Sequence, residues 1–228
     1  MGPIEPIFRP TPILGLRPTQ ITLGFEEVRA KRDSWKTKTA AQLAGFLQSH
    51  LAPTVLGPGR QFYLIDHHHL ARALYEEGVE ELFVTIVADL SRLPDDHFWP
   101  VMDMHGWTHP YDAKGRRRAY SDLPRTVKGM EDDPYRSLAG ELRNVGGFAK
   151  DSTPFAEFLW ADFLRPRLKA KAIRSDFQSA LAEALALSKT VAADYLPGWC
   201  GPHAYVVAPA PGLATPKTPA NGKKRKRA

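Results

Sequence analysis

Four consecutive polar residues, Asp66-His67-His68-His69, are the strongest candidates for chemistry in this chain. Imidazole changes its charge near neutral pH, so it can donate a hydrogen bond to phosphate or act as a general acid or base. Successive helical residues point about 100° apart, so the three rings cannot bind one metal ion together. The only cysteine, Cys200, offers no further zinc-ligand pair. The pattern favours phosphate binding and assigns no metal ligand; histidine packing in the core is the alternative.

Two arginines could complete a phosphate site. Arg136 and Arg143 lie seven residues apart on one predicted helix and share a face. Guanidinium groups suit bidentate contacts with phosphate. Surface ion pairing, for instance of Arg136 with Asp132 or Asp133, is the alternative interpretation.

Carboxylates near the N-terminus are a second set of candidates. Glu27 and Lys31 form an i, i+4 pair, which is typical of a solvated helix face. A carboxylate such as Glu26 or Glu27 could also act as a base, with Lys31 stabilising charge, in phosphoryl transfer. Glu157 lies in an otherwise apolar helix, so we expect it to pair with an arginine.

The histidine box requires a strand before it and a helix after it. Residues 61–65 form an apolar strand, and the Gly-Pro-Gly turn at 57–59 joins it to a strand at 53–56. We expect a helix capped by Asp66 and ending at Gly78. The unpaired N–H groups at the start of such a helix attract anions.

The other elements indicate an α+β fold with a helical second half. Helices are expected at 22–31 and 40–49, and the apolar run 82–88 is expected to be a strand buried on both faces. The second half predicts helices at 94–105, 133–143, 153–165 and 174–194, with a hairpin over 106–118. Asp133-Pro134 and Thr153-Pro154 are expected to cap their helices.

Charge and composition limit the functions that the protein can have. The net charge is +6, but six of the 31 basic residues lie in 201–228, which has no acid; 25 basic residues therefore face 25 acidic ones in 1–200. The tail could bind nucleic acid through its Lys-Lys-Arg-Lys-Arg end, or only aid solubility. We expect a cytoplasmic protein, because the sequence shows no secretory signal, no membrane span and a single cysteine.

Several blocks occur in an order that characterises one family. In chain order they are Leu16-Arg17-Pro18-Thr19-Gln20, Gly24, Val28, Lys31, Val55-Leu56-Gly57-Pro58, Asp66-His67-His68-His69, Asp132 to Ala139, Arg143, Gly146-Gly147, Phe155 to Phe163, and Leu196-Pro197-Gly198. With these blocks the chain resembles the putative ParB-like nuclease family, a branch of the ParB/sulfiredoxin fold superfamily. The resemblance spans about residues 14–200.

The resemblance implies a nucleotide-binding core with a polar box that holds phosphates. Members of the superfamily include partition proteins that bind and hydrolyse CTP, sulfiredoxins that use ATP and a serine kinase that uses ADP. The kinase has an Asp-Gly-His-His-Arg box, of which Asp66, His68 and His69 match here, whereas His67 and Leu70 replace the glycine and the arginine. ATP, ADP or CTP, with Mg²⁺, are therefore the expected cofactors.

We accordingly expect a compact mixed-sheet ParB/sulfiredoxin-like core at 14–127. An extended segment at 1–13 precedes it, a helical extension at 128–200 packs on it, and a disordered basic tail at 201–228 follows. The expected catalytic residues are Asp66, His68, His69, Glu26 and Glu27, and the expected nucleotide-binding residues are Gln20, Lys31, His67, Arg136, Ser137 and Arg143.

Two functions from different classes fit these expectations. The first is a nuclease or nucleotide-dependent phosphotransferase that binds phosphate at the histidine box. The alternative is a non-catalytic DNA-binding protein of the ParB type that uses its basic tail. The charge balance of 1–200 argues against a large DNA footprint on the folded part.

Overall fold

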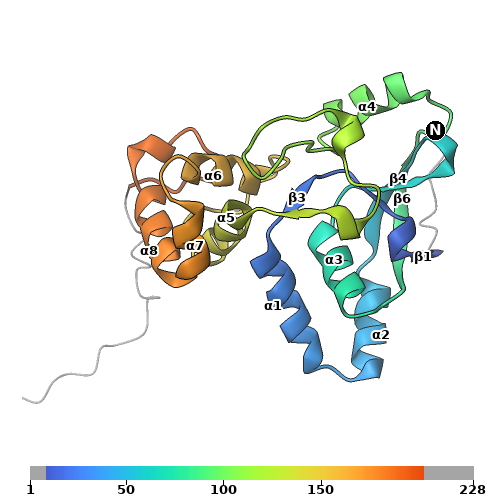
Figure 1. Cartoon of the computed structure of the whole chain (residues 1–228), viewed down its shortest axis with the longest axis horizontal. Coiled ribbons are helices and arrows are strands. Elements are labelled where there is room, and N and C mark those ends of the chain that lie inside the picture. Colours follow the sequence, from blue (N-terminus) through green and yellow to red (C-terminus); the bar gives the residue numbers. More distant parts are fainter. Residues whose placement is uncertain (1–8, 203–228) are drawn as a thin grey trace, which may run out of the picture.

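The computed structural model describes residues 9–202 and contains a curled, five-stranded mixed sheet (Figure 1). Its order is β1-β6-β4-β5-β2. The strands are β1 (Arg9–Pro12), β2 (Arg17–Pro18), β4 (Ala52–Leu56), β5 (Phe62–Leu64) and β6 (Glu81–Asp89). A separate two-stranded parallel pair consists of β3 (Thr22–Leu23) and β7 (Glu131–Asp132).

The predicted hairpin lies at the centre of this sheet. β4 pairs antiparallel with β5, and Gly59 adopts φ 65° in the turn between them. β6 then pairs parallel with β4, a pairing that requires a crossover. The helix α3 (His68–Glu76) forms that crossover, so the histidine box lies at the end of a central strand.

Eight α-helices are described, and they fall into two groups (Figure 1). The first group consists of α1 (Phe25–Lys36), α2 (Ala40–Ser49), α3 and α4 (Asp95–Met104), which pack near the sheet. The second group gathers at one end of the molecule and consists of α5 (Pro134–Asn144), α6 (Ala156–Leu164), α7 (Ala170–Ser175) and α8 (Phe177–Ser188). The expected α+β fold with a helical C-terminal region is confirmed.

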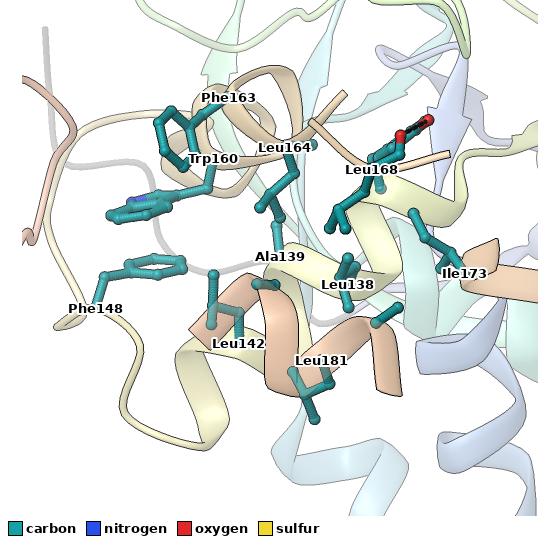
Figure 2. Packing of buried hydrophobic residues seen from close by; sticks show 14 of the residues in the cluster. Leu138, Ala139, Leu142, Phe148, Trp160, Phe163, Leu164, Leu168, Ile173 and Leu181 are labelled. Carbon is teal, nitrogen blue, oxygen red and sulfur yellow. Dashed lines mark hydrogen bonds between the residues drawn. The ribbon is translucent and has the colours of Figure 1, made fainter. Parts of the chain in front are cut away.

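Each group has its own hydrophobic core. Leu64, Leu74 and Val84 belong to the core beside the sheet and are fully buried. The helical core is built around Trp160, whose ring stacks on Phe148 with centroids 4.4 Å apart (Figure 2). Burying such side chains contributes about 1.5–3 kcal/mol each. A third, smaller cluster of Val55, Tyr63, Phe98 and Met102 packs α4 against the sheet. The site described below lies where the two groups of helices meet.

Several expected elements differ from the structure. The helix expected at 22–31 starts only at Phe25, because Thr22–Leu23 pairs with β7 as a strand. The strand expected at 82–88 is not buried on both faces; only Leu82 and Val84 are fully buried, and Val87 is 41% exposed. The less buried face of β6 carries apolar residues such as Phe83 and Val87, so the sequence did not reveal that this face is partly exposed.

The long helix expected at 174–194 is interrupted: α7 ends at Ser175, α8 covers only Phe177–Ser188, and a short 3-10 helix follows at Val191–Ala193. Asp176 ends α7 and caps α8, its carboxylate accepting a hydrogen bond from Ser179 N–H. Thr153 does not cap α6, whose N-cap is Phe155 in a left-handed conformation. The hairpin expected over 106–118 is reduced to one bridge, between Tyr111 and Arg117.

Two expectations lie outside the described residues. The disordered basic tail falls almost wholly within 203–228, and most of the extended N-terminal segment falls within 1–8. In the rest of that segment, Arg9–Pro12 is β1 and joins the edge of the sheet, and Ile13 begins a 3-10 helix. No helix between residues 9 and 202 has the length and apolar character needed to cross a membrane.

Candidate functional site

A large cavity lies beside the start of α3, with a volume of about 830 Å³. α1 and α2 form one wall through residues such as Lys31 and Phe46, and α5 and α6 form another through residues such as Arg136 and Phe158. The histidine box lies between these walls. The cavity therefore lies between the part of the chain that contains the sheet and its helical part.

Most of the residues expected to form a site meet in this cavity. Those that line it are Gln20, Glu27, Lys31, Asp66, His67, His69, Arg136 and Arg143. Three others, Glu26, His68 and Ser137, are not among the described residues that line it. Glu26 and Ser137 instead border a separate cavity of about 300 Å³.

Ser137 and Glu26 are engaged at the start of α1. The backbone N–H of Glu26 donates to Ser137 Oγ at 3.2 Å, and that of Phe25 donates to Asp132 Oδ1 at 3.1 Å. The Glu26 carboxylate pairs with Arg29 on the exposed face of the helix. In this structure these residues cap α1 and bind it to the start of α5.

His68 is buried, does not line the cavity, and binds a segment of the backbone that is distant in the sequence. Its Nε2 accepts a hydrogen bond from the Thr19 N–H at 3.2 Å, and the Thr19 hydroxyl donates to Leu64 O at 2.8 Å. Burial lowers the pKa of His68 to about 3, so the ring is neutral at physiological pH. The core-packing alternative considered for a histidine of this box describes His68 in this structure.

His69 lines the cavity but is also bound to the backbone. Its Nε2 accepts a hydrogen bond from the Gly24 N–H at 3.0 Å. Burial holds its pKa well below the usual value, and the charge of Arg136 lowers it further. The lone pair of Nε2 is therefore already used, and the ring orients the turn that precedes α1.

Asp66 and His67 occupy the junction between β5 and α3. Asp66 was expected to cap α3, but the N-cap is His67, which has φ 63°. The Asp66 Oδ1 atom accepts a hydrogen bond from the His67 N–H at 2.6 Å. No side chain caps α3, so its first N–H groups remain directed toward the cavity end of the helix.

Arg136 and Glu27 lie at the centre of the cavity wall. Arg136 is only 9% exposed, and its Nη1 donates to Glu27 Oε2 at 3.4 Å. The same Glu27 oxygen lies 3.4 Å from His69 Nε2, and Lys31 Nζ lies 3.9 Å from Glu27 Oε1. The alternative pairing of Arg136 with Asp132 or Asp133 is not found, because those carboxylates pair with Arg174 and Arg165.

Two buried nitrogen atoms in the cavity wall lack a partner. Among the described side chains, buried polar atoms without a hydrogen bond in the protein are His67 Nδ1 and Arg136 Nε. Leaving such a group unpaired costs about 1–3 kcal/mol, and more for a charged group. Both residues line the same cavity, although they come from different parts of the chain.

The cavity is also lined by lysines and aromatic residues that the sequence did not single out. Lys38 and Lys150 form no ion pair with a described residue, and Trp107 and Phe155 add apolar surface. Lys38 could have been found, because Glu27, Lys31, Ser34 and Lys38 follow each other at helical spacing and all line the cavity. Lys150 and Trp107 stand in loops and carry no such signal. Arg143 pairs with Glu157, as expected for that carboxylate.

A metal site is not evident in the described part of the chain. No group of three or more His, Cys, Asp or Glu side chains there is placed to hold an ion. Mg²⁺ commonly binds through one or two carboxylates together with substrate phosphates, so the cavity residues alone do not fix such an ion. Arg136 Nε is buried and has no partner in the protein, and guanidinium groups suit anionic ligands.

The comparisons with known proteins identify the family. Residues 10–166 match the family described as "Putative ParB-like nuclease", which is more than half of the chain. The chain belongs to this family. The matched range contains all of the cavity residues named above, from Gln20 to Phe158. A search of curated proteins found no match.

A solved structure is similar over nearly its whole length. The crystal structure of protein Atu1540 from Agrobacterium tumefaciens is 48% identical in sequence, with a TM-score of 0.82. The alignment covers 87% of this chain and 99% of that one. The ParB-like family member described here therefore shares its mixed sheet and its helical C-terminal region with that protein.

Proposed function

We propose that the protein binds a phosphate-bearing ligand in the cavity beside α3 and catalyses phosphoryl transfer or phosphodiester cleavage. The observation that carries this proposal is the unpaired, buried Nε of Arg136 in the cavity wall. A buried guanidinium with an unpaired N–H group destabilises the folded protein unless an anion accepts the missing hydrogen bond. A phosphate oxygen would supply that acceptor.

The charge around Arg136 supports an anionic ligand. Lys31, Lys38 and Lys150 line the same cavity, and Lys31 has only a distant contact with Glu27. The start of α3, with no side-chain cap, adds the positive end of a helix dipole. These groups would stabilise negative charge that develops on a phosphoryl group in the transition state.

The size and lining of the cavity favour a ligand larger than phosphate. Cavities of about 300–1,000 Å³ hold drug-sized ligands, and this one measures about 830 Å³. Trp107, Phe46 and Phe155 contribute apolar surface to it. A nucleotide, or one nucleotide of a strand, combines an aromatic base with phosphates and suits this lining.

Calorimetry tests the proposal directly. Pyrophosphate, ADP, ATP and CTP would be titrated into the full chain with and without Mg²⁺, and single- and double-stranded DNA would be assayed for cleavage. We expect heat of binding from at least one nucleotide. The proposal would be abandoned if no ligand gave heat and neither DNA were cleaved.

Arg136→Lys tests the residue on which the proposal depends. Lysine keeps the charge but lacks Nε and the planar fork, so binding should weaken about 10- to 100-fold, which corresponds to about 1.5–3 kcal/mol for a charge-assisted hydrogen bond. Arg29→Lys is the matched control, because Arg29 pairs with Glu26 on the exposed face of α1. Equal affinities in a folded Arg136→Lys variant and the control would exclude Arg136 as a ligand contact.

The DNA-binding alternative depends on residues 203–228, which the structure does not describe. Removing 201–228 separates the two functions. If DNA affinity disappears while nucleotide binding persists, the tail is accessory to the cavity. If nucleotides never bind, and DNA affinity depends on the tail alone, the non-catalytic alternative replaces the proposal.

A further inference from the structure

Backbone strain in this chain gathers at the cavity. Three described residues other than glycine have positive φ: Arg60 at 58°, His67 at 63° and Phe155 at 59°. Arg60 lies in the exposed turn between β4 and β5, but His67 and Phe155 both line the cavity. Side chains beyond glycine are disfavoured in this conformation, and such strain persists mainly where it serves a function.

His67 is also the one histidine of the box for which neither ring nitrogen hydrogen-bonds to a described residue. The Nε2 atoms of His68 and His69 accept hydrogen bonds from the N–H groups of Thr19 and Gly24. The buried Nδ1 atom of His67 has no partner among the described residues. His69 also lines the cavity, but its Nε2 is held by the Gly24 N–H, so of the described rings of the box only that of His67 lines the cavity with both nitrogens free of protein hydrogen bonds.

We propose that His67 is the proton acceptor of this site, and that its strained backbone is retained because it brings the imidazole to the ligand. The inference rests on the proposed function and names the residue that the reaction requires. His68 and His69, which match the expected box, would then be positioning residues. Their hydrogen bonds hold the backbone at Thr19 and Gly24, before and after β3.

The step is a conventional attack on phosphorus. The oxygen of a water molecule or of an alcohol forms a bond to phosphorus, and its proton passes to a ring nitrogen of His67. The bond between phosphorus and the leaving oxygen breaks, and its electron pair stays on that oxygen. Arg136 stabilises the negative charge on the phosphoryl oxygens during this step.

The surroundings of His67 keep the imidazole neutral and able to accept a proton. Burial is the largest influence and lowers its pKa, and electrostatic interactions with His50, which follows α2, and with Lys31 of α1 lower it further. The neighbouring Asp66 carboxylate acts in the opposite direction. A neutral imidazole near pH 7 is the form that a general base needs.

Replacing His67 by glycine separates an effect on function from an effect on folding. His67→Gly relieves the left-handed strain and removes the imidazole, and Arg60→Gly relieves the same strain outside the cavity. We expect both variants to unfold at the same or a higher temperature than the unaltered chain. With ATP and a labelled single-stranded DNA as probes, we expect His67→Gly to lose at least about 100-fold in turnover and Arg60→Gly to be unchanged.

Two further measurements test the chemical role. Added imidazole should restore part of the turnover of His67→Gly, because the ring fits the space that the substitution leaves. His67→Asn should fold, since asparagine tolerates positive φ, and should bind ADP while losing turnover. Both results would support a proton acceptor rather than a structural residue.

The outcomes distinguish the two proposals. If the unaltered chain binds no nucleotide and turns over neither probe, the proposed function fails, and this inference fails with it. If it binds ADP but turns over neither probe, or if His67→Gly retains full turnover, only the role of His67 is overturned. A marked fall in the unfolding temperature of His67→Gly alone, without rescue by imidazole, would also overturn it.

Discussion

At the scale of single residues, Gly24 links the histidine box to α5. Its N–H donates to His69, and a Cβ atom built on it would lie 2.6 Å from Ser137 Oγ and 2.8 Å from Ser137 Cα. The backbone of Gly24 has φ −84°, which any residue adopts. Close packing, and not backbone conformation, therefore demands glycine at this position.

Gly24→Ala should destabilise the fold by about 1–3 kcal/mol, since an added methyl group must displace the backbone of α5. Gly45→Ala is the control, because a Cβ there meets no atom within 4 Å and alanine favours a helix by about 0.5–1 kcal/mol. Urea unfolding of both variants measures the difference. Equal stabilities would show that α5 can move away from Gly24 at no cost.

The three histidines of the box illustrate why residue type alone did not assign roles. His68 accepts a hydrogen bond from the Thr19 N–H, and His69 accepts one from the Gly24 N–H. His67 lines the cavity and has an unpaired nitrogen. The partners of the first two lie 49 and 45 residues away in the sequence. Only the folded chain brings those backbone N–H groups to the rings.

At the scale of elements, α5 is held by a buried ion pair at its start. Asp133 caps the helix by accepting from the Tyr135 N–H at 3.0 Å, as expected from Asp-Pro at this position. Its carboxylate is buried and also pairs with Arg165 of the segment after α6, with Nη2 to Oδ2 at 2.9 Å. The cap thus joins α5 to the end of α6.

Asp133→Asn should cost about 3 kcal/mol, because the amide preserves the cap but leaves Arg165 without its buried partner. Asp176→Asn at the start of α8 is the matched control. It should cost less than about 0.5 kcal/mol, since Asn and Asp cap equally well and the position is exposed. Thermal unfolding would contradict the prediction if both substitutions had the same small effect.

At the scale of the whole molecule, neutral buried histidines link stability to pH. Burial lowers the pKa of His68 and of His109 to about 3, and that of His69 well below 6.5. In the unfolded chain these groups bind protons from about pH 6.5 downward. The unfolded state therefore gains protons that the folded state does not bind, and stability falls as the pH falls below 6.5.

Each such histidine should add up to about 1.4 kcal/mol per pH unit to this loss. Urea unfolding at pH 7.5, 6 and 5 measures the slope. His109→Phe should remove about one proton from the uptake on unfolding and so lower the slope of stability against pH. His109 packs among the rings of Tyr111, Phe155 and Phe158, where phenylalanine can replace it. An unchanged slope in this variant would mean that His109 is protonated in the folded chain.

The sequence by itself determined the local elements and the family. The central hairpin, α2, the strand–helix junction at Asp66 and the start of α5 all follow from turn residues, caps and apolar spacing, which depend on neighbours in the chain. It also named Glu27, Lys31, His67 and Arg136, although not their mutual contacts. Local chemistry is sufficient for these features because the interactions that specify them span only a few residues.

Only the tertiary structure decided which of these residues share a site. The packing of the helical region places Arg136 next to Glu27, 109 residues away in the sequence. His68 is buried in the core, and Ser137 caps α1. Lys38, which follows α1, and Lys150, from the loop between α5 and α6, both line the cavity. Burial, hydrogen-bond partners and strain depend on packing between distant segments, and no local pattern in the chain encodes which polar group is left unpaired.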